Sequence, residues 1–444
     1  MHEQILLKNK NLIIKIHLEE IEKDDLKIFK EKQLLIIRAD GAPEIYEIDE
    51  LGQIAIAEKE EKVNWRSFAK ENIRNFYKNL LQSRYSEIEH LVILTGAGSS
   101  VGIGEGENVG LTMAGLWNAL LKEDQGCLER LIRCTKYGNL EDGKEIDHQK
   151  IEKDLEALLS KAGMMNSVAP HKQLDEDIKT VKKFIVKKCT LCLSNTAPHQ
   201  SFLNKTTLRP QKYPRVKLFT LNYDTLFEDA AGKERFTVID GFTFSSPRIF
   251  NGKYFDYDII ETRHSRQDKH DSIIPKLFYL FKMHGSLTWE KKNGEITQSD
   301  SIEDVVNRVM IFPQDSKFEY SYEQPYFEMM ARFQQALRTE NTLLITIGYS
   351  YLDKHISSVI IESLKQNPSL NLITVTYPVV IGTDKSFQAE LHSITELQSR
   401  VTMIAETFTD FTLNYPENNA HKRFDMLEEL NQSLKKINLT TNVL

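Results

Sequence analysis

Cysteine is scarce in this chain, and long apolar runs and an excess of positive charge are missing. Its 444 residues include 4 cysteines, too few for the disulfide framework of a small secreted domain. Lysine and arginine number 57 against 64 aspartate and glutamate, which leaves a formal net charge of −7. No chain-wide positive field would therefore recruit nucleic acid, and we do not expect direct nucleic-acid binding.

Signals for export and membrane insertion are also missing. Charged residues interrupt every apolar run among the first thirty residues, whereas a secretory leader needs a continuous apolar segment. No uncharged apolar stretch approaches the roughly 20 residues of a membrane-spanning helix. We therefore expect a cytoplasmic protein without a membrane segment.

Glycine and proline, at 20 and 12 residues, are too scarce for a collagen-like or low-complexity chain. With 41% hydrophobic and 27% charged residues, the composition is that of a globular protein. At about 150 residues per domain, the length favours roughly two to three structural units.

Short apolar runs indicate a large parallel sheet. The run at 91–94 is continuous and apolar, as expected of a strand buried on both faces. Similar runs, separated by helical or irregular stretches, occur at 216–220, 277–281, 309–312, 343–347 and 372–375. The alternation predicts an α/β fold with a Rossmann-like, doubly wound parallel sheet over residues 63–410.

The remaining segments predict additions to that sheet. Residues 1–62 contain short β-rich runs and predict a small β-containing N-terminal unit. About 120 residues separate the first two predicted strands, more than one crossover helix needs, and their spacing predicts a helical insert at about 112–198. Residues 411–444 predict a C-terminal helical segment, with apolar side chains at helical spacing from Phe424 to Ile437.

A glycine-rich segment, Thr-Gly-Ala-Gly-Ser-Ser, runs from Thr95 to Ser100 directly after the first predicted strand. Glycines allow the backbone to approach a pyrophosphate, and a following helix would point its N-terminal amides at that group. The usual dinucleotide fingerprint is incomplete, because no second strand ending in an acidic residue follows about 20 positions later. The alternative is a tight strand-to-helix turn that binds nothing.

Asn222 and Asp224 follow the predicted strand 216–220 within the segment Thr-Leu-Asn-Tyr-Asp, which begins at Thr220. Ligands of open α/β sheets bind at the carboxyl ends of the strands, so these polar side chains are candidates for a site. The alternative is ordinary turn and helix-cap chemistry, for which Asn and Asp are equally suited.

Two more motifs end predicted strands. His284 follows strand 277–281, and a histidine there suits general-base chemistry near neutral pH. Gly348 and Ser350 follow strand 343–347, where backbone amides and a hydroxyl can hold a ribose or phosphate. The alternatives are a structural histidine and a turn that caps the next helix.

In their order along the chain, the four motifs resemble those of the sirtuin fold family: Gly-Ala-Gly-x-Ser, Thr-x-Asn-x-Asp, His-Gly and Gly-x-Ser. The resemblance spans roughly residues 91–380. It implies that NAD is the substrate and that the bond between nicotinamide and ribose is broken. The family pattern assigns the catalytic roles to Asn222, which would order the nucleophile, and to His284, which would act as base on a ribose hydroxyl.

The same resemblance implies a set of NAD-binding residues. Gly96, Ala97, Gly98 and Ser99 would hold the pyrophosphate, and Gly348 and Ser350 the adenosine side. Asp224 would support the pocket beside the nicotinamide ribose, and Thr220 is a further predicted NAD-binding residue.

Two departures separate the chain from the protein deacylases of that family. The Gly-Ile-Pro-Asp-Phe-Arg segment that follows the glycine loop in deacylases is replaced here by Gly-Ile-Gly-Glu, starting at Gly102. Deacylases also carry two Cys-x-x-Cys pairs after the histidine, whereas the one pair here, Cys189 and Cys192, precedes His284. We therefore expect buried free cysteines and no metal, although a four-cysteine site of unusual geometry is the alternative.

A sirtuin-like core with a helical insert and no zinc module resembles bacterial anti-phage sirtuin-like effectors. That resemblance implies an NAD glycohydrolase that acts in abortive infection, a homo-oligomer, and a HerA-like hexameric ATPase as a partner. Two alternatives are an NAD-dependent deacylase or ADP-ribosyltransferase, and a regulatory or scaffold subunit that binds NAD or ADP-ribose.

Overall fold

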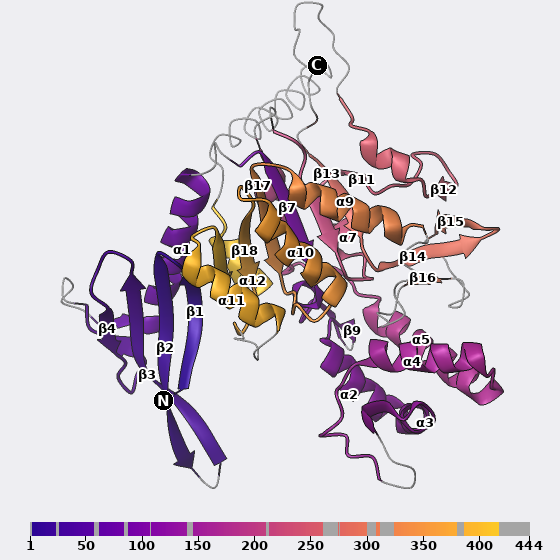
Figure 1. Ribbon diagram of the computed structural model, residues 1–444, viewed down its shortest axis with the longest axis horizontal. Coiled ribbons are helices and arrows are strands. Elements are labelled where there is room, and N and C mark those ends of the chain that lie inside the picture. The colour runs from indigo at the N-terminus through magenta and orange to yellow at the C-terminus, as the bar shows by residue number, and fades with distance from the viewer. Residues whose placement is uncertain are drawn as a thin grey trace, which may run out of the picture.

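The computed structural model describes residues 2–23, 26–56, 62–83, 88–106, 108–139, 145–209, 213–260, 274, 276–299, 308–310, 324–379 and 386–416. In these ranges the dominant feature is an 11-stranded mixed sheet, ordered β11-β13-β10-β7-β17-β18-β19-β1-β2-β3-β4 (Figure 1). The C-terminal helix predicted from Phe424 to Ile437 lies outside the described residues.

The first part of this sheet is parallel. Its strands are β11 (Thr237–Ile239), β13 (Leu277–Lys282), β10 (Lys217–Thr220), β7 (His90–Thr95), β17 (Thr342–Ile347), β18 (Asn371–Val375) and β19 (Val401–Ile404). The predicted α/β fold with a large parallel sheet is therefore confirmed. The sequence interpretation missed β11 and β19, because such short apolar runs are not distinctive by themselves.

The N-terminal β unit continues the same sheet. Its strands β1 (His2–Asn9), β2 (Leu12–Lys23), β3 (Leu26–Arg38) and β4 (Glu44–Glu47) are antiparallel. Strand β1 pairs antiparallel with β19, with Leu7 opposite Ile404. The unit predicted from residues 1–62 is thus hydrogen-bonded to the parallel part.

The predicted strand 309–312 was assigned to the wrong sheet. Residues 308–310 form β16 (Arg308–Met310), which belongs to a separate four-stranded antiparallel sheet. The other strands of that sheet are β12 (Arg248–Ile249), β14 (Gly285–Lys292) and β15 (Glu295–Gln298). An apolar run predicts a strand but not the strand with which it pairs, because pairing depends on the tertiary structure.

Two further two-stranded pairs are β5 (Gln53–Ile54) with β6 (Val63–Asn64), and β8 (Gly104–Glu105) with β9 (Asn108–Val109).

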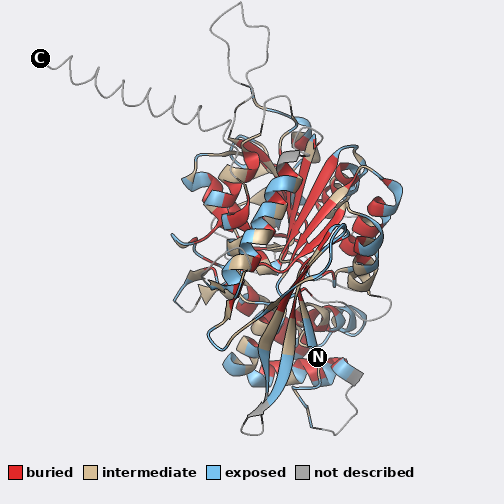
Figure 2. Ribbon diagram, turned by 90° about the vertical axis from the view of Figure 1, so that its left-hand side faces the viewer, coloured by how far each residue is buried: buried red, intermediate tan, exposed pale blue. Residues whose placement is uncertain are grey.

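Helices cover both faces of the parallel strands because successive strand residues point to opposite sides. Leu91 and Ile93 of β7 belong to one core cluster with α1 (Trp65–Ser83), α6 (His199–Thr207), α7 (Leu226–Lys233) and α12 (Phe408–Asn414). Val92 and Leu94 belong to the other, with α9 (Tyr326–Arg338), α10 (Lys354–Gln366) and α11 (Phe387–Leu397). In Figure 2 the central strands are accordingly coloured almost entirely as buried.

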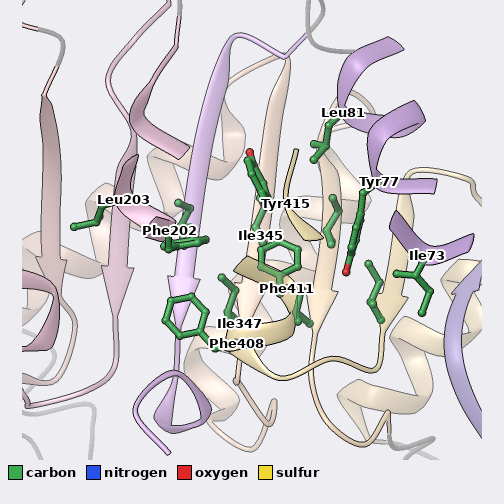
Figure 3. Close-up of a cluster of buried hydrophobic side chains, with 14 of the residues drawn as sticks. Ile73, Tyr77, Leu81, Phe202, Leu203, Ile345, Ile347, Phe408, Phe411 and Tyr415 are labelled. Atoms are coloured by element: carbon green, nitrogen blue, oxygen red, sulfur yellow. The ribbon is translucent and has the colours of Figure 1, made fainter. Parts of the chain in front are cut away.

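Aromatic side chains fill much of the first cluster. Figure 3 shows Phe408 and Phe411 of α12 beside Ile345 and Ile347 of β17, with Tyr77 of α1 close by. The rings of Tyr77 and Phe411 meet edge to face at 5.5 Å. The segment that follows the last parallel strand is therefore anchored in the core of the sheet.

A helical segment lies between β7 and β10, as the sequence predicts. It contains α2 (Met113–Glu123), α3 (Gln125–Thr135), α4 (Leu155–Val168) and α5 (Lys172–Cys189). These helices pack around a core of their own that includes Trp117, Leu131 and Leu158, and they gather in one group in Figure 1. We call α2 to α5 the helical insert. Among the described helices, none combines the length and apolar character required to cross a membrane.

His199 in α6 is a buried histidine that the fold keeps neutral. It is 0% exposed, and its ring meets those of Phe227 and Phe408 at 4.8 and 5.1 Å. Neither ring nitrogen has a hydrogen-bond partner in the described part of the chain. Burial lowers the pKa of His199 to about 3, because a charged imidazolium in this aromatic surrounding would lose its solvation.

We expect His199 to make the fold acid-sensitive. The unfolded chain takes up a proton at His199 below about pH 6.5, whereas the folded chain resists it down to about pH 3. The free energy of unfolding should therefore fall as the pH drops through this window, by up to about 1.4 kcal/mol per pH unit. Urea unfolding at several pH values measures the slope. H199L should flatten it and H171L, at an exposed histidine, should not; equal slopes in all three proteins would contradict the assignment.

Candidate functional site

The parallel register brings the four sequence motifs to one edge of the sheet. Thr95 of β7 lies opposite both Thr220 of β10 and Ile347 of β17, and Thr220 lies opposite Lys282 of β13. The segments that follow these residues consequently leave neighbouring strands at the same level. Since ligands of open α/β sheets bind at this carboxyl edge, the candidate site is located here.

Backbone contacts lock the two glycine-containing loops together. The Gly96 and Gly98 N–H groups donate to the carbonyl oxygens of Ile347 and Gly348, each at 3.0 Å. A Cβ on Gly348 would lie 2.5 Å from the Cα of Gly98, and the φ of Gly348 is +60°. Glycine is required at Gly348 for both reasons, since a side chain would clash and would strain the backbone.

The helix expected directly after the glycine loop is not there, so this prediction was wrong. A single 3-10 turn, Ala97–Ser99, follows Gly96, and the chain then enters β8 before α2 begins at Met113. Gly102 and Gly104 have φ values of +77° and +136°, which are incompatible with a continuing helix. The Ser99 and Ser100 N–H groups donate back to Gly96 and Ala97, so no helix N-terminus presents its amides to a pyrophosphate here.

Asn222 is held against the glycine loop by its side-chain amide. Its Nδ2 lies 3.0 Å from the Gly96 carbonyl oxygen and 2.8 Å from Ser100 Oγ, and also 3.1 Å from Ser99 Oγ. Because the nitrogen faces these acceptors, Oδ1 is turned the other way and accepts no hydrogen bond from the described residues. Asn222 is half-buried, so this oxygen is suited to orient a water molecule.

Asp224 is a buried carboxylate that anchors the same loop. Its Oδ2 accepts a 2.7 Å bond from Ser100 Oγ, and its Oδ1 accepts a 3.2 Å bond from the Leu226 N–H. Burial raises the pKa of Asp224, while the Lys282 charge and the bond from Ser100 oppose that shift. Ser100 therefore links Asn222 to Asp224 in one hydrogen-bonded chain.

Lys282 supplies the positive charge beneath this loop. The side chain is 2% exposed, and its Nζ donates to Glu228 Oε1 at 2.8 Å and to the backbone oxygens of Tyr223 and Asp224. Buried charges are tolerated when they are paired and hydrogen-bonded in this way. The Lys282 side chain thereby fixes the backbone of the loop that carries Asn222.

His284 is paired with a carboxylate from the far side of the site. Its Nε2 lies 3.2 Å from Asp353 Oδ2, and both side chains are about nine-tenths buried, at 11% and 9% exposed. Asp353 is also the N-cap of α10, where its Oδ1 accepts from the His355 and Ile356 N–H groups. The contact with Asp353 therefore fixes the orientation of the His284 ring.

The structure brings most of the predicted residues together. Asn222 and His284 each lie two residues beyond the directly paired Thr220 and Lys282, so both follow adjacent strands at the same edge of the sheet. The Thr220 hydroxyl accepts from the Asn222 N–H at 3.2 Å. Ser350 is exposed on the other loop, and its carbonyl oxygen accepts from Gln388.

Sequence reasoning missed the roles of Ser100, Lys282 and Asp353. A signal existed for Ser100, because the Gly-Ala-Gly-x-Ser pattern places its serine at this position, whereas Ser99 was chosen. Ser99 is buried and donates to Gly96. Nothing in the sequence connects Asp353 to His284, since the contact joins segments that follow different strands.

The cysteines differ in part from the expectation. Cys127 is buried and unpaired as predicted, but Cys134 and Cys192 are exposed. All four cysteines are free, and within the described ranges no group of three or more metal-ligating side chains occurs.

A family model described as a SIR2-like domain matches residues 216–395. The match runs from the start of β10 into α11 and contains Asn222, His284 and Gly348, while the glycine loop and the helical insert precede it. Domains of this kind often belong to NAD-consuming enzymes. No curated protein matches the chain.

Substituting Gly348 tests the contact between the two loops. G348A should lower the free energy of unfolding by about 1–3 kcal/mol through overpacking, beyond the cost of its positive φ. G102A is the matched control, because Gly102 also has a positive φ but has open space where the Cβ would lie. Denaturant unfolding compares the two, and equal losses would show that the loops are not in close contact.

Proposed function

From the SIR2-like domain of residues 216–395, we propose that this protein is an NAD glycohydrolase, which uses water to split NAD into nicotinamide and ADP-ribose. The observation that carries the proposal is that Asn222 and His284 follow adjacent strands at one sheet edge, each two residues beyond the paired Thr220 and Lys282.

The chemistry needs a positioned ribose and a positioned water more than a strong acid. The pyridinium ring leaves as neutral nicotinamide, and positive charge develops on the ribose. Preorganised dipoles and a correctly placed nucleophile stabilise such a transition state. In our proposal Asn222 Oδ1 accepts a hydrogen bond from the attacking water, and the water oxygen forms the new bond to the ribose carbon as nicotinamide leaves. The proton released from the water passes to solvent.

His284 is proposed to accept a hydrogen bond or a proton from a ribose hydroxyl, with Asp353 stabilising the imidazolium that forms. Asp353 lies 3.2 Å from His284 Nε2. When the proton moves to His284, the negative charge lies on the ribose oxygen, close to the ribose carbon where positive charge develops during bond cleavage.

The glycine loops divide into contact and support residues. Ala97 and Ser350 are exposed, and Gly98 and Gly348 are half-buried, so we propose these four as the NAD-contacting surface. Gly96 and Ser99 are buried and use their polar atoms within the protein; we propose that they shape this surface. Thr220 and Asp224 likewise support Asn222.

We also propose that the activity serves anti-phage defence by depleting NAD, as the resemblance to bacterial effectors implies. An enzyme that depletes NAD must be held inactive until needed, so the proposal includes a homo-oligomer and a hexameric ATPase partner of the HerA type. Assays of nicotinamide release with and without the co-expressed ATPase test this part.

Two single substitutions test the catalytic assignment. N222A and H284A should keep the fold, measured by thermal unfolding, and should each lower nicotinamide release from NAD by at least about 10²-fold. H171A, at an exposed histidine of the insert, should leave the rate unchanged. If both site variants turned over NAD at the parental rate, the assignment would fail.

The same assay separates the alternatives. An added acylated peptide that increased turnover would indicate a deacylase, and labelled ADP-ribose on protein would indicate a transferase. A parental protein that binds NAD without cleaving it, alone and with the ATPase, would indicate a binding subunit.

Asp353 can be tested apart from its role as a helix cap. D353N removes the carboxylate charge beside His284, but Asn is as good an N-cap as Asp. We expect thermal stability close to the parental value and a kcat roughly 10²-fold lower or more. D353A, which loses the cap as well, should lose stability in addition. A parental kcat in D353N would show that the Asp353 carboxylate is not needed.

A further inference from the structure

The helical insert has its own apolar core and no motif assigned to the proposed reaction. It nevertheless contacts the loop that carries Asn222. The Tyr223 hydroxyl donates a 2.9 Å hydrogen bond to Glu156 Oε1, and Glu156 lies in the first turn of α4. The bond thus joins the insert to the residue between Asn222 and Asp224.

Tyr223 is a buried residue whose hydroxyl links the helical insert to the loop that carries Asn222. It is 7% exposed, and burial beside Glu156 raises the pKa of its phenol well above the usual value. The phenol therefore remains protonated and continues to donate to Glu156. A charge-assisted hydrogen bond in a partly buried setting, as here, is stronger and more directional than one at the surface.

Glu156 is held in place by the local structure of its own helix. Asp154 is the N-cap of α4 and accepts from the Ala157 N–H at 2.9 Å, which satisfies an unpaired amide of the first turn. The neighbouring Leu155 and Leu158 are 0% exposed in the core of the insert. The carboxylate is therefore presented to Tyr223 from a rigid element.

The backbone of Tyr223 is fixed on the opposite side by the sheet. Its carbonyl oxygen accepts from the Leu287 N–H at 3.1 Å and from Lys282 Nζ at 3.3 Å. The insert thus holds the side chain of Tyr223 while β13 and β14 hold its main chain. Adjacent Cα atoms are only about 3.8 Å apart, so Tyr223 and Asn222 share one short stretch of main chain. Without the side-chain bond to Glu156, that stretch would be held by the sheet contacts alone.

We propose that Glu156 is a positioning residue, which acts through Tyr223 to hold Asn222 in its reactive geometry and so makes turnover depend on the placement of the insert. The inference rests on the proposed NAD hydrolysis. It adds that a partner bound to the helical insert would change the rate through this bond.

The test compares E156Q, Y223F and their double variant with Y137F. Tyr137 is a buried tyrosine of the same insert that packs beside Trp117, so Y137F controls for loss of a tyrosine hydroxyl from the insert away from the loop. E156Q and Y223F should each lower kcat about 10-fold or more with KM within 2-fold, because misplacement of a catalytic group affects the reaction step. The double variant should be no slower than the slower single variant.

A second readout does not depend on activity. Amide hydrogen exchange in peptides covering 216–230 should become faster in E156Q and Y223F but stay at the parental rate in Y137F. If parental protein released no nicotinamide while exchange changed in this pattern, the proposed function would fail. The bond between Tyr223 and Glu156 would then order the loop that carries Asn222 without a role in NAD hydrolysis. Parental kcat together with parental exchange in folded E156Q and Y223F, or fully additive losses in the double variant, would overturn the inference.

Discussion

The hydrogen-bond register of four adjacent parallel strands is the constraint on which the candidate site depends. Thr95, Thr220, Lys282 and Ile347 lie at one level across β13, β10, β7 and β17. A slip of one residue in any pair would turn the side chains of that strand to the opposite face. Two separate cores, one on each face, resist such a slip because each strand buries apolar side chains on both sides. The register in turn places the segments that carry Asn222 and His284 at the same edge of the sheet.

Beyond the carboxyl ends of these strands, polar contacts link loops that are far apart in the sequence. Ser100 joins Asn222 to Asp224, Lys282 supports the backbone of that loop, and Asp353 joins α10 to His284. Most of these groups are buried, where an unpaired polar atom is costly. The loops are thereby limited to one arrangement. In the proposed reaction, that limitation is what positions the nucleophile and the base.

The helical insert and the N-terminal strands are attached to this core in different ways. Strand β1 extends the sheet through ordinary ladder bonds to β19, far from the glycine loops in the strand order. The insert instead reaches the loop that carries Asn222 through a buried side chain, Tyr223. Of the two additions to the parallel sheet, the insert is therefore the one with a direct physical route to Asn222.

Sequence alone identified five of the seven described parallel strands and the residues at their ends, because a strand buried on both faces needs a continuous apolar run and the motifs follow such runs directly. It also located the helical insert from the length and spacing of the segment. These are local properties, because each depends on a few neighbouring residues. The sheet that receives Val309, the missing helix after Gly98, and the exposure of Cys134 and Cys192 depend instead on partners distant in the chain. So do the pairing of His284 with Asp353 and the contact between Tyr223 and Glu156, since a hydrogen bond between remote segments exists only once the strands have aligned.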